Sequence, residues 1–266
     1  MDILERIVAQ QAQDLIRRKQ SFPESYWESA PLFNRPCISL KSALNESSTG
    51  IIAEFKRRSP SKPSINFKAQ VSEVASEYQA AGISGMSVLT NGPFFGGSLE
   101  DLSQARASAN MPLLRKEFVI DPYQITEAKA HGADVILLIA ACLEPARLRM
   151  LAKKTKSLGM EVLLEVHNEA ELQANLIPEV DLIGVNNRNL KTFTVNVQTS
   201  LDLLQQIPQE FTPISESGLS DPKTVAMLGQ AGFKGFLMGE HFMRSENPGE
   251  AAAAFVNALK NQRNED

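Results

Sequence analysis

The feature that most constrains the fold is a regular alternation of short apolar runs with longer helical patterns. Eight runs rich in aliphatic and β-branched residues occupy residues 51–56, 85–90, 112–118, 134–140, 161–166, 181–186, 212–217 and 235–239. Their spacing is too long for β-hairpins and is typical of βαβ units, in which helices join parallel strands. Eight such units predict an α/β fold with a closed (β/α)8 TIM barrel, although an open doubly wound sheet would give the same pattern.

Residues at the expected helix ends support this alternation. Glycine ends a helical pattern before four of the strands, at Gly82, Gly132, Gly159 and Gly232. Glycine readily takes the left-handed conformation that closes a helix. Proline, which suits a first helical turn, begins three of the helices, in Asp121-Pro122, Glu144-Pro145 and Asp221-Pro222.

Residues 1–48 precede the first strand and carry a helical pattern of their own. Apolar residues recur at Ile3, Ile7 and Leu15, and an aromatic cluster that includes Trp27 follows. We expect a helical extension over 1–48 packed on a barrel over 49–266, forming one domain overall. The extension could cover one mouth of the barrel.

Composition and charge exclude several classes of protein. The net charge of -4 provides no basic surface for nucleic acid or for an anionic membrane, but a small anionic substrate remains compatible. Cys37 and Cys142 are too few for a disulfide framework, and we expect them to be packing residues in a reducing compartment. Acids and amides interrupt the N-terminal apolar pattern, so neither a secretory signal nor a membrane span is expected there. These features predict a soluble, cytoplasmic protein.

The sequence gives no sign of a metal or a cofactor. None of His131, His167 and His241 has the spacing of a metal ligand. There is also no dinucleotide-binding glycine fingerprint and no GxSxG nucleophile motif.

Polar residues recur where the expected strands end, which is where the active site of a parallel barrel forms. They are Glu54 and Lys56, Lys116 and Glu117, Glu165, Asn186 and Arg188, and Glu216 and Ser217. Taken singly, Glu54 with Lys56 could be a structural ion pair, and Lys116 could belong to a solvated charge run. Repetition on five strands instead favours one converging polar site.

Strand alternation refines two of these positions. Lys116 shares a strand face with Leu114 and therefore points inward if Leu114 does. Glu165 shares a face with Leu163, so its carboxylate should have partly apolar surroundings. Such burial would raise the pKa of Glu165 and suit it to proton transfer.

The last two units predict a phosphate site. SESGLSD (215–221) places hydroxyls and a glycine ahead of a helix, and Gly239 opens a short helix in FLMGEHFMR (236–244). Loops after strands seven and eight, with a short helix, bind phosphate recurrently in this fold. Each glycine alone could be a plain turn, but the two together favour a phosphate.

Several motifs in order carry a close resemblance to the indole-3-glycerol phosphate synthase family over nearly the whole chain. They are IIAEFKRRSPS (51–61), SVLTNGPFFGGS (87–98), PLLRKEFVIDPYQI (112–125), GADVILLIAA, LLEVHNEAEL, IGVNNRNL (183–190), ISESGL (214–219) and FLMGEHFMR. The resemblance implies a carbon-carbon lyase, a carboxy-lyase of tryptophan biosynthesis that needs no cofactor. It would convert 1-(2-carboxyphenylamino)-1-deoxyribulose 5-phosphate to indole-3-glycerol phosphate, releasing carbon dioxide and water.

The resemblance also implies roles for individual residues. Lys116 matches the general acid of ring closure, and Glu165 matches the carboxylate that assists proton transfer during dehydration. Lys56 matches a lysine that binds the substrate and is a candidate acid in dehydration, with Glu54 orienting the cations. Asn186 completes the expected catalytic group.

The remaining matches are expected to bind the substrate. These are Ser59 and Pro60 of a mobile first loop, the aromatic walls Phe95 and Phe118, and Arg188, Glu216 and Ser217. Ser217, Gly218, Gly239 and Glu240 match the phosphate region, mostly through backbone amides. Because a carboxylate would repel phosphate, we expect the side chain of Glu240 to point away from it.

Two departures from the family pattern concern loop contacts: Asn91 stands where the family often has an acid, and Asn189 replaces a common Asp. Two other readings remain open, a phosphosugar isomerase or other phosphate-binding barrel, and a non-catalytic ligand-binding barrel. The expected partner is a small phosphorylated substrate, with no nucleic acid and no membrane. We expect a monomer, with a homo-oligomer as the alternative.

Overall fold

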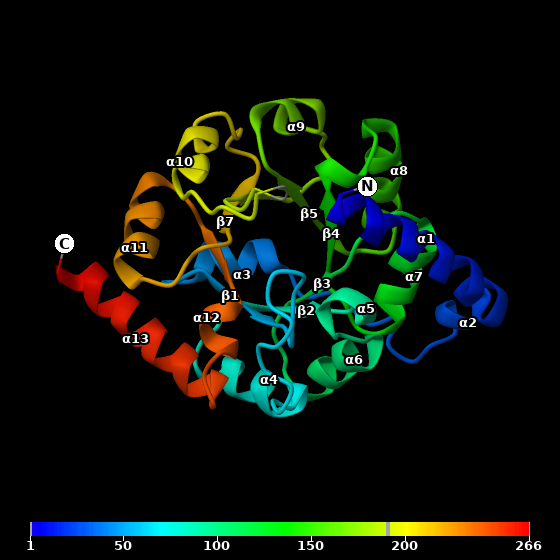
Figure 1. Cartoon of the computed structure of the whole chain (residues 1–266), viewed down its shortest axis with the longest axis horizontal. Helices are drawn as coiled ribbons and strands as arrows, with labels where there is room; N and C mark the ends of the chain where they lie inside the picture. Colours follow the sequence, from blue (N-terminus) through cyan, green and yellow to red (C-terminus); the bar gives the residue numbers. More distant parts are fainter. Residues whose placement is uncertain (1, 190–191, 266) are drawn as a thin grey trace.

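The computed structural model describes residues 2–189 and 192–265, and its strands form a closed parallel barrel (Figure 1). The strands are β1 Ile51–Phe55, β2 Gly85–Leu89, β3 Leu113–Lys116, β4 Val135–Ile139, β5 Glu161–Val166, β6 Leu182–Asn186, β7 Thr212–Glu216 and β8 Gly235–Met238. Each pairs with the next in chain order, and β8 pairs with β1. The predicted (β/α)8 barrel is therefore confirmed, and the open doubly wound sheet is wrong.

Helices follow the strands around the outside of the barrel. Their bounds are α4 Val71–Ala80, α5 Gly92–Phe95, α6 Leu99–Ser108, α7 Pro122–Ala130, α8 Pro145–Ser157, α9 Glu169–Ala174, α10 Gln198–Leu204, α11 Pro222–Ala231, α12 Glu240–Met243 and α13 Pro248–Glu265, with a short 3₁₀ turn at Ala140–Cys142. Helices α7, α8 and α11 begin at the predicted prolines, and all four predicted glycines have positive φ. No described helix is long and apolar enough to cross a membrane.

The strand that differs most from its predicted length is β3. We expected residues 112–118, but β3 spans only Leu113–Lys116. The chain leaves the sheet at Glu117, whose carboxylate accepts a hydrogen bond from the backbone N–H of Phe118 at 3.0 Å. This local turn places Glu117 and Phe118 in the loop above the barrel.

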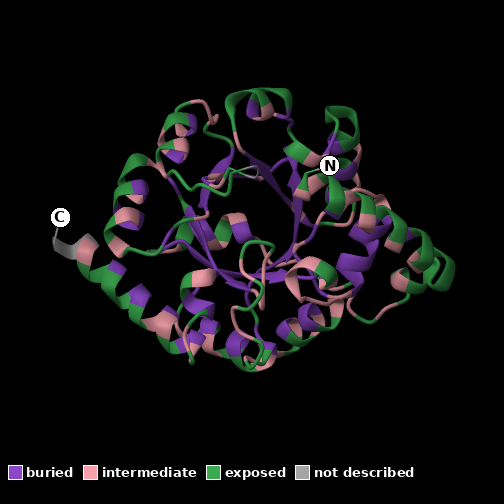
Figure 2. Ribbon diagram, in the orientation of Figure 1, coloured by how far each residue is buried: buried purple, intermediate pink, exposed green. Residues whose placement is uncertain are grey.

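The apolar core has two layers, because both faces of a parallel barrel sheet are covered (Figure 2). Ile52, Leu114, Leu137 and Leu163 belong to the inner cluster. A larger cluster fills the space between the strands and the inward faces of the helices. Leu114 and Leu163 thus face the barrel interior, and so do the polar residues that share their strand faces.

The N-terminal extension contacts both ends of the barrel. Its helices are α1 Ile3–Ser21, α2 Glu24–Glu28 and α3 Leu40–Glu46. Leu40 and Leu44 of α3 join the inner cluster at the N-terminal ends of the strands. Helix α1 lies beside α7 and reaches the opposite end (Figure 1), where Ile3 and Ile7 line a cavity. Helix α1 therefore lies at one mouth of the barrel, as expected, and α3 packs at the other end.

Candidate active site

A cavity of about 350 Å³ opens at the C-terminal ends of the strands, and every predicted site residue lines it. They are Glu54, Lys56, Ser59, Pro60, Phe95, Lys116, Phe118, Glu165, Asn186, Arg188, Glu216, Ser217, Gly218, Gly239 and Glu240. The lining also includes Glu117, one of the predicted strand-end polar residues, and residues that the sequence did not assign to the site, among them Ile3, Leu4, Ile7, Phe193, His241 and Arg244.

Lys116 lies at the centre of the polar part of the cavity. Its Nζ is 2.6 Å from Glu216 Oε2 and 3.3 Å from Glu165 Oε2. The other oxygen of Glu165 accepts a hydrogen bond from Asn186 Nδ2 at 3.0 Å. Because the Lys116 side chain is only 15% exposed, the alternative of a solvated charge run is wrong.

The surrounding carboxylates keep Lys116 protonated. Burial acts to lower the pKa of its ammonium, but the negative charges of Glu216, Glu165 and Glu54 outweigh burial and hold that pKa above its usual value. The group is thus a cation across the neutral pH range and can donate a proton to a bound molecule.

The carboxyl with the raised pKa is Glu216, not Glu165. Burial raises the pKa of Glu216 to about 7 despite its contact with Lys116. Burial acts in the same direction on Glu165, but Lys116 and His167 outweigh it, so the pKa of Glu165 is lowered. The expectation for Glu165 was wrong because the sequence showed its apolar neighbours but not the cations across the barrel.

Gly184 of β6 makes room for the Glu216 carboxylate. A Cβ at this position would lie 2.0 Å from Glu216 Oε1, closer than non-bonded atoms approach. Oε1 is itself buried and has no hydrogen-bond partner among the described residues. The Glu216 carboxylate is thus packed against β6, with Oε2 bound to Lys116 and Oε1 enclosed.

His167, which was not among the predicted site residues, also belongs to this cluster. Its Nε2 lies 3.5 Å from Glu165 Oε1, and its Nδ1 lies 3.1 Å from Glu171 Oε2. Burial acts to lower the pKa of His167, but the bond to Glu171 and the charge of Glu165 outweigh it and raise that pKa. A charged His167 helps to keep Glu165 ionised.

The raised pKa of Glu216 leads to a prediction about stability and pH. A carboxyl whose pKa is higher in the folded than in the unfolded chain stabilises the fold below the unfolded value, and that stabilisation is lost as pH rises through the folded value. Between about pH 4.5 and 7, wild type should therefore lose up to about 3 kcal/mol relative to Glu216→Gln. Urea unfolding of both proteins at pH 5 and at pH 7.5 measures this difference. A difference that is the same at both pH values would contradict the assignment.

Glu54 and Lys56 form an ion pair that faces the cavity. Lys56 Nζ lies 2.5 Å from Glu54 Oε1, and both residues belong to the lining. The pair stands where β1 ends, on the strand face of Ile52. Its position therefore allows a substrate-binding role as well as the structural one.

The loop after β1 is fastened on two sides. Arg57 binds both carboxylate oxygens of Asp101 in α6, at 2.6 and 2.8 Å. Lys62 forms an ion pair with Glu240 at the start of α12. These contacts hold Ser59 and Pro60 over the cavity.

Two aromatic rings form an apolar wall on the side of β2 and β3. The ring centroids of Phe95 in α5 and Phe118 after β3 are 6.1 Å apart, and the rings are tilted by 36°. Leu137 and Ile139 of β4 continue the apolar surface. This side of the cavity is suited to a flat aromatic group.

The loops after β7 and β8 form the opposite side. Ser217 and Gly218 both have positive φ, 69° and 77°. A Cβ on Gly218 would also lie 2.2 Å from Val195 Cγ1, so this position requires glycine. Strained backbone of this kind at Ser217 is a feature of ligand-binding loops.

No group of three or more His, Cys, Asp or Glu side chains in the described ranges is arranged to hold a metal ion. The cationic side chains of the cavity are those of lysines and arginines.

Comparison with known proteins assigns the family. Residues 4–255 match the family model of indole-3-glycerol phosphate synthase. The chain belongs to the indole-3-glycerol phosphate synthase family. The indole-3-glycerol phosphate synthase of Bacteroides thetaiotaomicron is 45% identical, and the matched region covers 97% of this chain and 99% of that protein. The indole-3-glycerol phosphate synthase of Bordetella pertussis is 40% identical, and the matched region covers 96% of this chain and 99% of that protein.

More distant solved structures share the fold alone. The structure of KGPDC from Streptococcus mutans matches 79% of this chain and 97% of its own, with a TM-score of 0.60 and 14% identity. The native KDPGal structure matches 83% of this chain and 97% of its own chain, with a TM-score of 0.58 and 16% sequence identity. By contrast, the family's own activity is that of a carboxy-lyase of tryptophan biosynthesis.

The structure shows how this member of the indole-3-glycerol phosphate synthase family accommodates the departure at Asn91 and the carboxylate of Glu240. Asn91 caps α5 by accepting from Phe94 N, and its amide donates to Glu117 Oε1 at 3.1 Å. An acid could make the first contact but not the second. Glu240 is bound by Lys62 and Arg244, and Lys62 outweighs burial so that the pKa of Glu240 is lowered.

Proposed function

We propose that this cavity closes the indole ring of 1-(2-carboxyphenylamino)-1-deoxyribulose 5-phosphate by lysine and glutamate acid-base catalysis. The observation that carries the proposal is the position of Lys116. Its ammonium is held between Glu165 and Glu216, with an aromatic wall on one side and the β7 and β8 loops on the other. Family membership supports the same reaction.

The two ends of the substrate would then bind on opposite sides of the cavity. Phe95 and Phe118 receive the carboxyphenyl ring. The loop at Ser217 and Gly218, together with Gly239 at the start of α12, receives the phosphate, as such loops do in other barrels. Because Glu240 is already paired with two cations, it opposes the phosphate charge less than a free carboxylate would.

This orientation brings the C2' carbonyl oxygen toward Lys116. The ring carbon that carries the carboxylate attacks C2', and Lys116 donates a proton as negative charge grows on the oxygen. Loss of carbon dioxide restores the aromatic ring. Glu165, kept ionised by its cationic neighbours, then accepts a proton from the ring-closed intermediate, while Lys56 donates a proton to the hydroxyl, which leaves as water and completes the indole.

Lys56 and Asn186 have supporting roles in this proposal. Lys56, oriented by Glu54, binds the substrate and is the second ammonium within the cavity. Asn186 donates to Glu165 Oε1 and holds this carboxylate in place. Arg188, at the end of β6, is available to the substrate carboxylate or hydroxyls.

Product formation tests the proposal directly. Purified protein with the carboxyphenylamino substrate should give a rise in indole fluorescence, and a chelator such as EDTA should leave the rate unchanged. Carbon dioxide should form in equal amount. A phosphosugar isomerase would consume its substrate without an indole signal, and no signal at saturating substrate would overturn the proposal.

We further propose that the protein works in the cytoplasm as a monomer on a phosphorylated small molecule. The glycerol phosphate in the name of the matched family supports a phosphorylated substrate. Light scattering on the purified protein would reveal a stable oligomer if one exists.

A further inference from the structure

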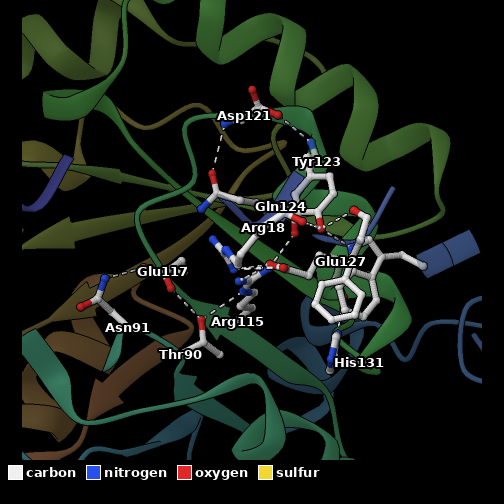
Figure 3. Close-up of polar contacts among 12 residues, drawn as sticks. Arg18, Thr90, Asn91, Arg115, Glu117, Asp121, Tyr123, Gln124, Glu127 and His131 are labelled. Carbon is white, nitrogen blue, oxygen red and sulfur yellow. Dashed lines mark hydrogen bonds and ion pairs between the residues drawn. The ribbon is translucent and has the colours of Figure 1, made fainter. Parts of the chain in front are cut away.

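A buried polar network lies behind β3, on the side away from the cavity (Figure 3). At its centre is Arg115, which is 0% exposed. Because strand side chains alternate, Arg115 points outward where its neighbour Lys116 points into the cavity. The proposed reaction gives Arg115 no role.

The charge of Arg115 is balanced by a single carboxylate. Arg115 Nη2 lies 2.8 Å from Glu127 Oε2 in α7, and Glu127 is also 0% exposed. Arg18 of α1 adds a second guanidinium, with Nη1 at 3.0 and 2.8 Å from the two oxygens of Glu127. Both oxygens of the buried Glu127 carboxylate are thus paired with cations.

The other two nitrogens of Arg115 start two arms of the network. In the first arm, Nε donates to Thr90 Oγ1 at 3.0 Å, and the Thr90 hydroxyl donates to Glu117 Oε2 at 3.0 Å. Glu117 Oε1 then accepts from the backbone N–H of Phe118 at 3.0 Å and from Asn91 Nδ2 at 3.1 Å. This arm therefore ends on the N–H side of Phe118.

The second arm ends on the carbonyl side of the same residue. Arg115 Nη1 donates to the backbone oxygen of Gln124 at 2.7 Å. Gln124 Nε2 donates to the carbonyl oxygen of Phe118 at 2.9 Å. Gln124 Oε1 accepts from the N–H of Ile120 at 2.8 Å and so fixes the rest of the loop.

Phe95 is tied to the first arm as well. Asn91 donates to Glu117 and also caps α5, the short helix that carries Phe95. The two aromatic rings of the wall are thus set by hydrogen bonds that meet at Glu117. None of the residues in either arm except Glu117 and Phe118 lines the cavity.

We propose that Arg115 is a positioning residue for the aromatic wall, acting through Thr90 and Glu117 and through Gln124 to fix Phe118. The inference rests on the proposed function, because it takes the wall to hold the carboxyphenyl ring. If Arg115 served only to pair with the buried carboxylate of Glu127, its hydrogen bonds to Thr90 and Gln124 would have no function. A small displacement of a group that positions the substrate can slow a reaction strongly. We therefore expect the network to affect substrate binding through the position of Phe118.

Thr90→Val tests the first arm, because valine keeps the shape and removes the hydroxyl. We expect KM for the substrate to rise about tenfold, which corresponds to about 1.4 kcal/mol, with kcat changed by no more than about threefold. Thr90→Ser keeps the hydroxyl and should restore KM. Arg18→Met is the matched control, since it removes a contact to Glu127 outside both arms and should lower Tm without changing KM.

Gln124→Glu tests the second arm and keeps the proposal testable if Thr90→Val does not fold. The change retains the acceptor for Ile120 but removes the donor to Phe118, and KM should rise again. Binding of 2-aminobenzoate, followed by its fluorescence, should weaken in both variants while the affinity for inorganic phosphate stays the same. Folded variants with unchanged KM and unchanged 2-aminobenzoate affinity would overturn the proposal. A wild type that binds 2-aminobenzoate but forms no indole would instead overturn the proposed function.

Discussion

Replacing Lys116 with alanine is expected to reduce turnover by a factor of about 10³ or more, the upper part of the range for loss of a general acid. The cavity's second lysine, Lys56, is paired with Glu54 at 2.5 Å at the end of a different strand, so its ammonium does not lie between Glu165 and Glu216 as that of Lys116 does. Single-turnover measurements of indole formation would give the loss at the ring-closing step.

The fold should survive this change. Removing the ammonium leaves Glu165 and Glu216 together in a buried site, but Glu216 already has a pKa of about 7 and can take up a proton. The affinity for inorganic phosphate should be close to that of wild type, because Lys116 donates to the carboxylates of Glu165 and Glu216, whereas the phosphate is proposed to bind the backbone of the β7 and β8 loops.

Lys129→Ala is the matched control for Lys116→Ala. Lys129 is also buried, but it lies in α7, where its Nζ donates to the backbone oxygen of Arg35 at 2.8 Å. This variant should lose stability and keep its turnover. Near-normal turnover of a folded Lys116→Ala protein would remove Lys116 from the role of general acid.

Local patterns predicted most of the barrel. The apolar runs gave the eight strands, and the Asp-Pro and Gly residues gave helix ends, because these signals depend on near neighbours in the chain. Strand alternation also predicted correctly that Lys116 shares the inner face of Leu114. β3 ends before the predicted residue 118 because the Glu117 side chain bonds to its own loop.

The electrostatics of the site could not be predicted in the same way. Whether the pKa of Glu165 rises or falls depends on Lys116 and His167, and Lys116 comes from a strand two places away in the barrel. His167 was not selected because its contact with Glu165 depends on the turn after β5. Nor does any sequence pattern indicate that Ile3 of α1 reaches the cavity, about fifty residues before β1 ends.

Glu165→Gln is expected to slow the loss of water rather than ring closure. Glutamine keeps the size of the side chain and an oxygen that can accept from Asn186, but it cannot take up a proton at neutral pH. Glu216 still holds Lys116 at 2.6 Å, so the first step retains its acid. Overall turnover should fall by about 10²-fold, and the decarboxylated intermediate that precedes dehydration should accumulate in quenched samples.

Glu161→Gln provides the control on the same strand. Glu161 begins β5 at the opposite end of the barrel, where its carboxylate accepts from the backbone N–H groups of Leu40 and Lys41 at 2.8 and 3.0 Å. The Glu161→Gln variant should have a lower Tm, because residues at the N-terminal end of a barrel contribute to stability. The time course of its reaction should match that of wild type. If Glu165→Gln showed the same time course as Glu161→Gln, with no intermediate, then the proton acceptor for dehydration would have to be a different group. Glu216 would be the first to consider, because it is the other carboxylate in contact with Lys116.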